Sequence, residues 1–308
     1  MIIYKHSDCL LKDNGLNHPE RKERIDSILK SIEQIKDFEI NFKDAPLADI
    51  ETISLVHPKK HIEKIFSNIP KSGLIGVEKE PYADTMLCPN SKKAILRSCG
   101  AGIAAADDLM KKNERVFCAI RPPGHHAETT KAMGFCFINN IAVTAKYLQN
   151  KYKVNKIAII DFDVHHGNGT QEIFYNDETV LYASSHEFPL FPGTGSEQET
   201  GVGNIFNAPL KTGMKGNEFL KIFDQKILRP IDKFKPEIIL ISAGFDAHVR
   251  DPLANINLES EDFYQITKQI VDLANIHSKG RVISFLEGGY DLQALSESIK
   301  QHLLALKN

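Results

Sequence analysis

The chain has few cysteines, and none of them lies in a closely spaced pair. There are five: Cys9, Cys88, Cys99, Cys118 and Cys136. An odd number of scattered cysteines argues against a disulfide-stapled scaffold and against a zinc site built from thiolates. We therefore expect all five thiols to be reduced.

Long apolar runs are also absent. No stretch reaches the roughly 18 apolar residues that a membrane-spanning helix needs. Residues 1–6 lack the charged segment and the long apolar segment of a secretion signal. These absences predict a cytoplasmic protein with no membrane partner.

An excess of charge of either sign is missing as well. The 38 basic and 40 acidic residues give a net charge of -2, so no broad basic field exists to bind nucleic acid directly. Hydrophobic residues make up 42% of the chain, which is enough for a substantial core. The 308 residues contain no linker-like segment, so we expect one catalytic domain spanning residues 1–308.

Short apolar runs alternate with longer helical patterns along the chain. We expect strands at residues 116–120, 156–160, 179–183, 237–242 and 281–286. We expect helices at residues 19–36, 91–112, 138–150, 216–234, 260–277 and 292–306. This alternation predicts parallel βαβ units and therefore an α/β fold.

Four of the five expected strands end in polar or glycine-rich segments. These segments are residues 121–126, 161–170, 243–248 and 287–290. Because parallel strands have their carboxyl ends at one edge of the sheet, the four segments should line one crevice.

Asp163, His165 and Asp246 are the candidate metal ligands. In extended backbone Asp163 and His165 share a face, while Phe162 and Val164 would pack behind them. Asp246 would complete three ligands and leave a position for water or substrate. Zn²⁺ fits this set, and Fe²⁺ fits it comparably well. The alternative for Asp246 is a helix or turn cap, which the three other polar strand ends make less favoured.

Two adjacent histidines, His125 and His126, follow a stiff Pro-Pro-Gly turn. Side chains of adjacent residues usually diverge, so partners must hold them, and Asp161 and Asn168 can orient one ring each. A carboxylate raises the basicity of an imidazole more than an amide does. The two histidines should therefore differ in pKa and in role. The alternative, two solvent-exposed loop histidines, fits either residue alone better than both.

Tyr290 follows two glycines, which allow a tight turn and a close approach of backbone. Its hydroxyl group could stabilise a developing oxyanion in the crevice. The alternative is an amphipathic tyrosine at the edge of the domain, which is a common use of this residue.

Together these segments resemble the histone deacetylase superfamily, which includes bacterial deacetylases and acetylpolyamine amidohydrolases and has the arginase/deacetylase fold. The resemblance runs from His18 to Tyr290, nearly the whole chain. It implies a three-layer α/β/α fold with a mainly parallel sheet of about eight strands. It also implies a catalytic Zn²⁺ and hydrolysis of an amide with release of acetate. Asn168 and Glu287 resemble class II and bacterial deacetylases rather than class I members.

The resemblance implies roles for individual residues. The metal ligands of the family match Asp163, His165 and Asp246. His126 matches the general base that later acts as an acid, whereas His125, paired with Asp161, would act mainly through its charge. A structural K⁺ site is also implied, with the side chains of Asp161 and Ser184 and the backbone carbonyl groups of Asp163, His165 and Ser185.

A tunnel for a lysine side chain is implied by further matches. Gly134 and Phe135 match its wall, and Phe135 would face Phe191 across a methylene chain. Leu253 stands where one branch of polyamine-selective relatives has a glutamate, and an apolar residue cannot pair with a second ammonium group. Asp84 matches an aspartate at the rim that accepts hydrogen bonds from the backbone of the substrate.

The favoured function is thus hydrolysis of N-acetyl-lysine in a peptide or protein. Deacetylation of polyamines or other small acetylated amines stays open, since other relatives carry their acidic selector in a different loop. A metal-bearing binder of acetyl-lysine without activity and an arginase-like two-manganese enzyme are less favoured. Residues 71–84 and 196–207 could form a tunnel rim or the interface of an oligomer.

Overall fold

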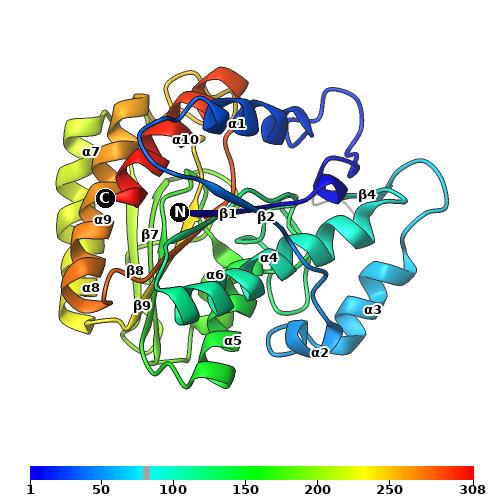
Figure 1. Cartoon of the computed structure of the whole chain (residues 1–308), viewed down its shortest axis with the longest axis horizontal. Helices are drawn as coiled ribbons and strands as arrows, with labels where there is room; N and C mark the ends of the chain where they lie inside the picture. The colour runs from blue at the N-terminus through cyan, green and yellow to red at the C-terminus, as the bar shows by residue number, and fades with distance from the viewer. Residues whose placement is uncertain (79–83) are drawn as a thin grey trace.

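The computed structural model describes residues 1–78 and 84–308 (Figure 1). Its centre is an eight-stranded sheet in the order β2-β1-β5-β10-β9-β6-β7-β8, and every neighbouring pair is parallel. The strands are β1 (Ile2–Lys5), β2 (Asn41–Asp44), β5 (Val116–Cys118), β6 (Ile157–Asp161), β7 (Val180–Glu187), β8 (Ile205–Leu210), β9 (Ile238–Ala243) and β10 (Val282–Leu286). The predicted parallel sheet of about eight strands is confirmed.

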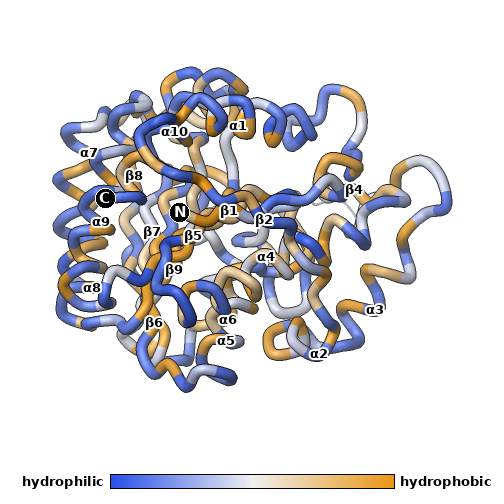
Figure 2. Tube along the Cα trace, in the orientation of Figure 1, coloured by the Kyte–Doolittle hydropathy of each residue, from blue (hydrophilic) through white to orange (hydrophobic). Residues whose placement is uncertain are grey.

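Helices cover both faces of the sheet, so its strands are buried on both sides (Figure 1). One face packs against α1 (Glu23–Glu33), α7 (Gly216–Ile222), α8 (Arg229–Phe234), α9 (Ser260–His277) and α10 (Leu292–Lys307). The other face packs against α4 (Ser91–Lys112), α5 (Asn140–Tyr152) and α6 (Asn168–Phe174). The layers explain why the central strands are mostly apolar on both faces, with Ser242 in β9 and Ser284 in β10 as the polar positions (Figure 2).

A smaller apolar cluster lies beyond α4. It includes residues of α2 (Ile50–Ile53) and α3 (Lys59–Ser67) together with Leu87 of β4. Strands β3 (Ile75–Gly76) and β4 (Met86–Leu87) pair in an antiparallel arrangement. Strand β3 lies within residues 71–84, and β4 follows that segment. Part of that segment, residues 79–83, lies outside the described residues.

The predicted helix start at Pro19 is wrong. Helix α1 begins at Glu23. Residues 10–22 form a loop, which follows the short helical turn η1 (Ser7–Cys9). The reason is the side chain of Glu20, which is fully buried and pairs with Arg121 in the segment that follows β5. This tertiary ion pair takes precedence over the preference of Pro19 for the first turn of a helix.

The helix predicted over residues 216–234 forms as three consecutive pieces. Between α7 and α8 lies a π-helical segment, η2 (Phe223–Leu228), and Pro230 follows it at the start of α8. Proline has no backbone N–H to donate to the preceding turn, so a local change of hydrogen bonding is expected here. The six predicted helices otherwise lie where the periodicity places them.

Among the described residues, no helix is long and apolar enough to span a membrane. All five cysteines are buried with free thiols, as predicted.

Candidate metal and catalytic site

The four polar segments meet at one edge of the sheet, as the sequence predicts. They follow β5, β6, β9 and β10, which are consecutive in the sheet order β5-β10-β9-β6. Because all four strands are parallel, their carboxyl ends deliver these segments to a common crevice.

Asp163, His165 and Asp246 converge in this crevice. All three are buried, and one ligand atom from each lies within 4.8 Å of the others. The Nδ1 atom of His165 is 3.2 Å from Oδ1 of Asp163 and 3.1 Å from Oδ2 of Asp246. Two carboxylate oxygens and one imidazole nitrogen at such distances suit a divalent metal ion such as Zn²⁺ or Fe²⁺.

The backbone places these ligands differently from the expected extended strand. Strand β6 ends at Asp161, and residues 163–165 form bends, yet Phe162 and Val164 are buried in the core as predicted. The N–H groups of Gly288 and Val164 donate to Oδ2 of Asp163 (2.8 Å) and to Oδ1 of Asp246 (3.0 Å). A Cβ atom at position 288 would lie 2.1 Å from Oδ2 of Asp246, so only glycine fits there. These contacts leave one oxygen of each carboxylate directed towards His165.

The charges of the three ligands also fit a cation. Burial disfavours a charged His165, but its hydrogen bonds to Asp163 and Asp246 raise its pKa to about 10. Burial likewise opposes ionisation of Asp163, yet the neighbouring His125 and His165 hold its pKa well below the usual range. Burial and the charge of Asp163 raise the pKa of Asp246. Both carboxylates therefore stay ionised together only beside a positive charge, which a proton on His165 or a bound metal ion can provide.

His125 and His126 are held by the two partners that the sequence predicts. Nδ1 of His125 is 3.0 Å from Oδ2 of Asp161, and Nδ1 of His126 is 2.9 Å from Oδ1 of Asn168. The ring centres lie 4.0 Å apart. Both side chains are almost completely buried, so the alternative of two solvent-exposed loop histidines is wrong.

The two rings have opposite pKa shifts. Burial lowers the pKa of His125, but the charges of Asp161 and Asp163 outweigh it and raise that pKa to about 10. Burial and the nearby His125 and His165 hold the pKa of His126 well below its ordinary value. At neutral pH the pair therefore consists of a cationic His125 and a neutral His126, as expected from a carboxylate and an amide partner.

Glu287 holds the backbone of the histidine pair, a role that the sequence did not reveal. Its Oε2 atom accepts hydrogen bonds from the N–H groups of Gly124 (2.7 Å) and His125 (3.2 Å). Its Oε1 atom accepts one from the hydroxyl group of Ser242. Burial raises the pKa of Glu287 to about 7. An acidic residue ahead of two glycines was visible in the sequence, but the N–H groups that it binds are about 160 residues away.

A cavity of about 230 Å³ opens onto these groups. All five residues predicted for the substrate tunnel line it, together with His126, His165, Tyr290 and one residue not predicted, Leu190. The predicted five are Asp84, Gly134, Phe135, Phe191 and Leu253. One ligand of the metal cluster, His165, thus shares a largely apolar space with the neutral histidine and the tyrosine.

The tunnel wall at Gly134 and Phe135 is tightly constrained. Both residues have positive φ angles, 56° and 67°, and a Cβ atom at position 134 would lie 2.4 Å from Cδ2 of His126. The positive φ angle of Phe135 costs about 1–3 kcal/mol, which the contacts of this residue must offset. Its N–H donates to Oγ1 of Thr85 (3.0 Å), and its ring lies edge-on to His18, 4.7 Å between centres.

Tyr290 is held at its backbone and at its ring. Its N–H donates to Oδ2 of Asp251 (2.7 Å), and the guanidinium group of Arg24 lies 5.0 Å from its ring centre. With only 8% of its surface exposed and its side chain lining the cavity, Tyr290 is not the edge tyrosine of the alternative interpretation.

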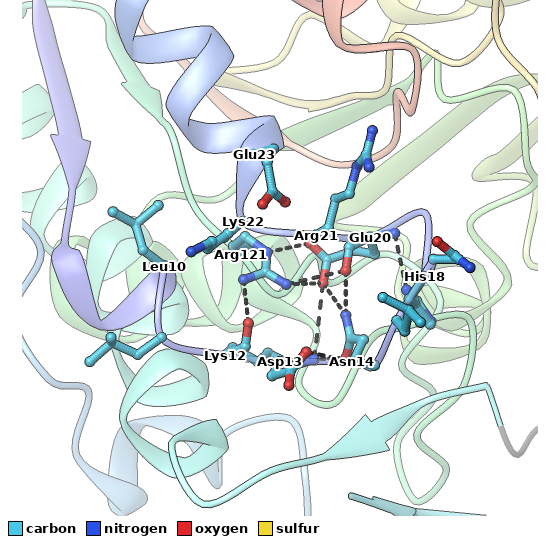
Figure 3. A pocket seen from close by; sticks show the side chains of 14 residues that line it. Leu10, Lys12, Asp13, Asn14, His18, Glu20, Arg21, Lys22, Glu23 and Arg121 are labelled. Atoms are coloured by element: carbon cyan, nitrogen blue, oxygen red, sulfur yellow. Dashed lines mark hydrogen bonds and ion pairs between the residues drawn. The ribbon is translucent and has the colours of Figure 1, made fainter.

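A buried ion cluster stands beside the catalytic cavity and lines a second one of about 690 Å³ (Figure 3). Glu20 accepts two parallel hydrogen bonds from Arg121, at 2.5 and 2.9 Å, and a further one from Asn14. Arg24 is 3.4 Å from the same carboxylate, and the ammonium group of Lys12 is 4.0 Å away. The sequence placed Glu20 only in a helix start, because partners 101 residues apart leave no local pattern.

The residues matched to a K⁺ site also lie together. Asp161 and Ser184 are cross-strand partners in β6 and β7. Oδ2 of Asp161 accepts a hydrogen bond from the hydroxyl group of Tyr182 (3.0 Å), and Ser184 contacts His186. Ser185 follows Ser184 in β7, and Asp163 and His165 follow the end of the neighbouring strand β6.

Comparison with known proteins agrees with this geometry. A family model described as the histone deacetylase domain matches residues 18–306. The rice protein (Oryza sativa subsp. japonica) named histone deacetylase 10, chloroplastic, is 38% identical, and the match covers 97% of this chain and 71% of that protein. A probable deacetylase from the archaeon Archaeoglobus fulgidus is 35% identical, with 94% and 81% covered.

A solved structure is similar to almost the whole of this chain. The HDA15 HD domain has 29% sequence identity with this chain and a TM-score of 0.91, and the match covers 99% of this chain and 89% of that domain. The likeness includes the sheet and the helical layers on both of its faces.

Proposed function

The chain belongs to the histone deacetylase family, and from this premise we propose that it is a Zn²⁺-dependent hydrolase that removes acetyl groups from N-acetyl-lysine side chains. One observation carries the proposal. The cavity of about 230 Å³ brings an imidazole of the metal cluster, a neutral histidine and a tyrosine to a single apolar passage.

Asp163, His165 and Asp246 would hold the metal ion. When bound, a divalent ion supplies a Lewis acid that polarises the acetyl carbonyl and lowers the pKa of water. Fe²⁺ stays an alternative, because one imidazole and two carboxylates suit both ions. The described residues contain a single group of three converging ligands, which gives no support to a two-metal arginase-like site.

His126 is the proposed general base. It is neutral, and its Nδ1 atom faces Asn168, so Nε2 keeps the free electron pair. His126 removes a proton from the attacking water and returns it to the departing lysine amine. The hydroxyl group of Tyr290, in the same cavity, donates a hydrogen bond to the oxyanion that develops on the acetyl group.

His125 acts through its charge. Asp161 keeps it protonated, and its ring centre is 4.0 Å from that of His126. A fixed cation at this position stabilises negative charge that develops during attack and lowers the proton affinity of His126. The release of the proton from His126 to the leaving amine becomes easier as a result.

The walls of the cavity favour a lysine side chain. Phe135, Phe191, Leu190 and Leu253 offer apolar surface to four methylene groups, while Asp84 stands at the lining as an acceptor. The presence of Asp84 also supports a second candidate, a small acetylated amine whose distant ammonium group pairs with this carboxylate. Leu253 favours the first candidate, because it offers no such pairing.

Two further predictions from the sequence become proposals. The placement of Asp161 and Ser184 supports a K⁺ site, and the one central sheet supports a single catalytic domain over residues 1–308. The cytoplasmic location stays a prediction, since a similar protein from rice is named chloroplastic. The acetylated partner, the absence of nucleic-acid and membrane partners, and a possible oligomer also stay predictions.

The test is a comparison of kcat/KM for an acetyl-lysine peptide and for acetylputrescine. The protein should be measured as purified, after removal of metal with a chelator, and after addition of Zn²⁺ or Fe²⁺. A preference for the peptide that disappears with the metal and returns with Zn²⁺ supports the proposal. A preference for acetylputrescine favours the second candidate, and no turnover of any acetylated amine by the Zn²⁺-loaded protein overturns both.

A further inference from the structure

We propose that Glu128 is a positioning residue for catalysis, because its carboxylate fixes the orientation of the Asn168 amide and thereby decides which nitrogen of His126 carries the proton. The inference rests on the proposed role of His126 as the general base. Glu128 has no part in the resemblance or in the predicted site.

A chain of two hydrogen bonds connects the three residues. Nδ2 of Asn168 donates to Oε1 of Glu128 (2.7 Å), and Oδ1 of Asn168 lies 2.9 Å from Nδ1 of His126. A carboxylate can only accept, so the NH₂ end of the amide must face Glu128. Its oxygen then faces His126, Nδ1 of that ring must be the donor, and Nε2 is left with the electron pair.

The amide needs such a support because its two ends have nearly the same shape. If it were reversed, its NH₂ group would face Nδ1 and favour the other tautomer, whose Nε2 cannot accept a proton. The remaining acceptors near Nδ2 are weak. The carbonyl oxygen of His126 is 3.5 Å away, and Sδ of Met133 is 3.4 Å away. Glu128 is therefore the strong acceptor that sets the direction.

The position of Glu128 separates this effect from substrate binding. Glu128 is half-buried and is not among the residues that line the catalytic cavity. Its backbone is held by two hydrogen bonds with Lys131, and the next residue, Thr129, is held by Glu172 at 2.9 and 2.7 Å. Loss of the Glu128 carboxylate should thus change kcat and leave KM nearly unchanged.

The first test compares Glu128→Met, Glu128→Gln and Glu172→Met in the Zn²⁺-loaded protein, with metal content measured for each. Glu128→Met, which has no strong acceptor, should lower kcat roughly tenfold, the scale of an outer partner of a catalytic group. Glu128→Gln should keep most of the activity, because its Oε1 can still accept from Asn168. Glu172→Met, which loosens the same loop without touching Asn168, should leave kcat unchanged.

A second background distinguishes positioning from a structural role. In the variant Asn168→Asp both side-chain oxygens are acceptors, so either orientation presents an acceptor to His126. Glu128 would then face another carboxylate. There Glu128→Met should leave kcat unchanged or raise it. A similar fall of kcat in both backgrounds, or no fall in the native background, overturns the proposal.

A measurement without turnover keeps the inference separate from the proposed function. Nitrogen-15 NMR of the Zn²⁺-loaded protein, labelled at histidine, reports which ring nitrogen of His126 is protonated. The native protein should show protonated Nδ1, and Glu128→Met should show a mixture or protonated Nε2. If no acetylated amine is hydrolysed but the tautomer shifts, the proposed function fails while the control of the His126 tautomer by Glu128 holds. An unchanged tautomer refutes that control.

Discussion

The guanidinium group of Arg24 lies 5.0 Å from the ring centre of Tyr290 and binds the backbone at Glu287 and Gly289, just before this tyrosine. Its Nη2 donates to the carbonyl oxygen of Glu287 (2.5 Å), and its Nε donates to that of Gly289 (2.7 Å). Arg24 belongs to α1, whereas these carbonyl groups follow β10, more than 260 residues later. Helix α1 is therefore joined directly to the backbone and the ring that position Tyr290.

Replacing Arg24 by Lys tests this relationship. A lysine keeps the positive charge but cannot make the two directed hydrogen bonds or the flat contact with the ring. We expect kcat to fall roughly tenfold, as for other residues that orient a catalytic group, and Tm to decrease. The control is Arg21→Lys, an exposed neighbour, which should change neither quantity. An unchanged kcat in Arg24→Lys would show that Tyr290 does not depend on this contact.

Removal of the Tyr290 hydroxyl group tests the oxyanion role directly. Tyr290→Phe keeps the ring against Arg24, so the fold and the metal content should be unchanged. If the hydroxyl donates to the oxyanion, kcat should fall by roughly 10²–10³ with little change in KM. A variant that turns over as fast as the native protein would exclude Tyr290 from the mechanism.

The role of His126 as a base predicts a larger fall of kcat than the loss of the Tyr290 hydroxyl group. His126→Ala removes the base and should lower kcat by about 10²–10⁴, whereas Zn²⁺ content should stay near that of the native protein, since His126 is not a proposed ligand. The measurement is kcat together with the metal content of the purified variant. Turnover close to native would transfer the base role to another group.

Much of this site was predictable because its signals are local in sequence. The apolar run before Asp161 and the Asp-x-His spacing identify a strand end and two ligands, and parallel topology joins them to His125, His126 and Asp246. The helices over residues 91–112 and 260–277 have the predicted bounds, because their amphipathic periodicity is long.

The parts that were missed depend on contacts between distant segments. Strands β2 and β8 lie at the two edges of the sheet, where β2 is mostly exposed and β8 contains Asn207 and Pro209, so neither has the apolar pattern of a central strand.

The loop position of Glu20 and the support that Glu287 gives to His125 follow from partners more than 100 residues away. No spacing rule reaches that far.

The tunnel wall offers a change of specificity. Leu253→Glu would place a carboxylate at the lining of the cavity, where it can pair with a second ammonium group. We expect kcat/KM for acetylputrescine to rise several-fold relative to that for an acetyl-lysine peptide, because a partly exposed ion pair contributes about 0.2–1 kcal/mol. Leu253→Gln, equal in size but neutral, is the control. If both variants shift the ratio equally, shape rather than charge selects the substrate at this position.

The buried ammonium group of Lys12 predicts how stability depends on pH. Only 2% of this residue is exposed, and burial, assisted by the charge of Arg121, lowers its pKa to about 8 in spite of the attraction of Glu20. In the unfolded chain the pKa is roughly 10.4. Between these values the unfolded chain holds a proton that the folded chain has released, so the free energy of unfolding should increase as the pH rises from 8 to 10.

Lys12→Met isolates this contribution, because it fills a similar volume without a titrating group. Urea unfolding at several pH values from 7 to 10 should show that the stability of the native protein rises relative to the variant, by up to about 3 kcal/mol. The rise should be absent below pH 7, where both states of Lys12 are protonated. Parallel curves for the two proteins across the range would mean that Lys12 keeps an ordinary pKa, and that the cluster around Glu20 accommodates a third full positive charge beside Arg24 and Arg121.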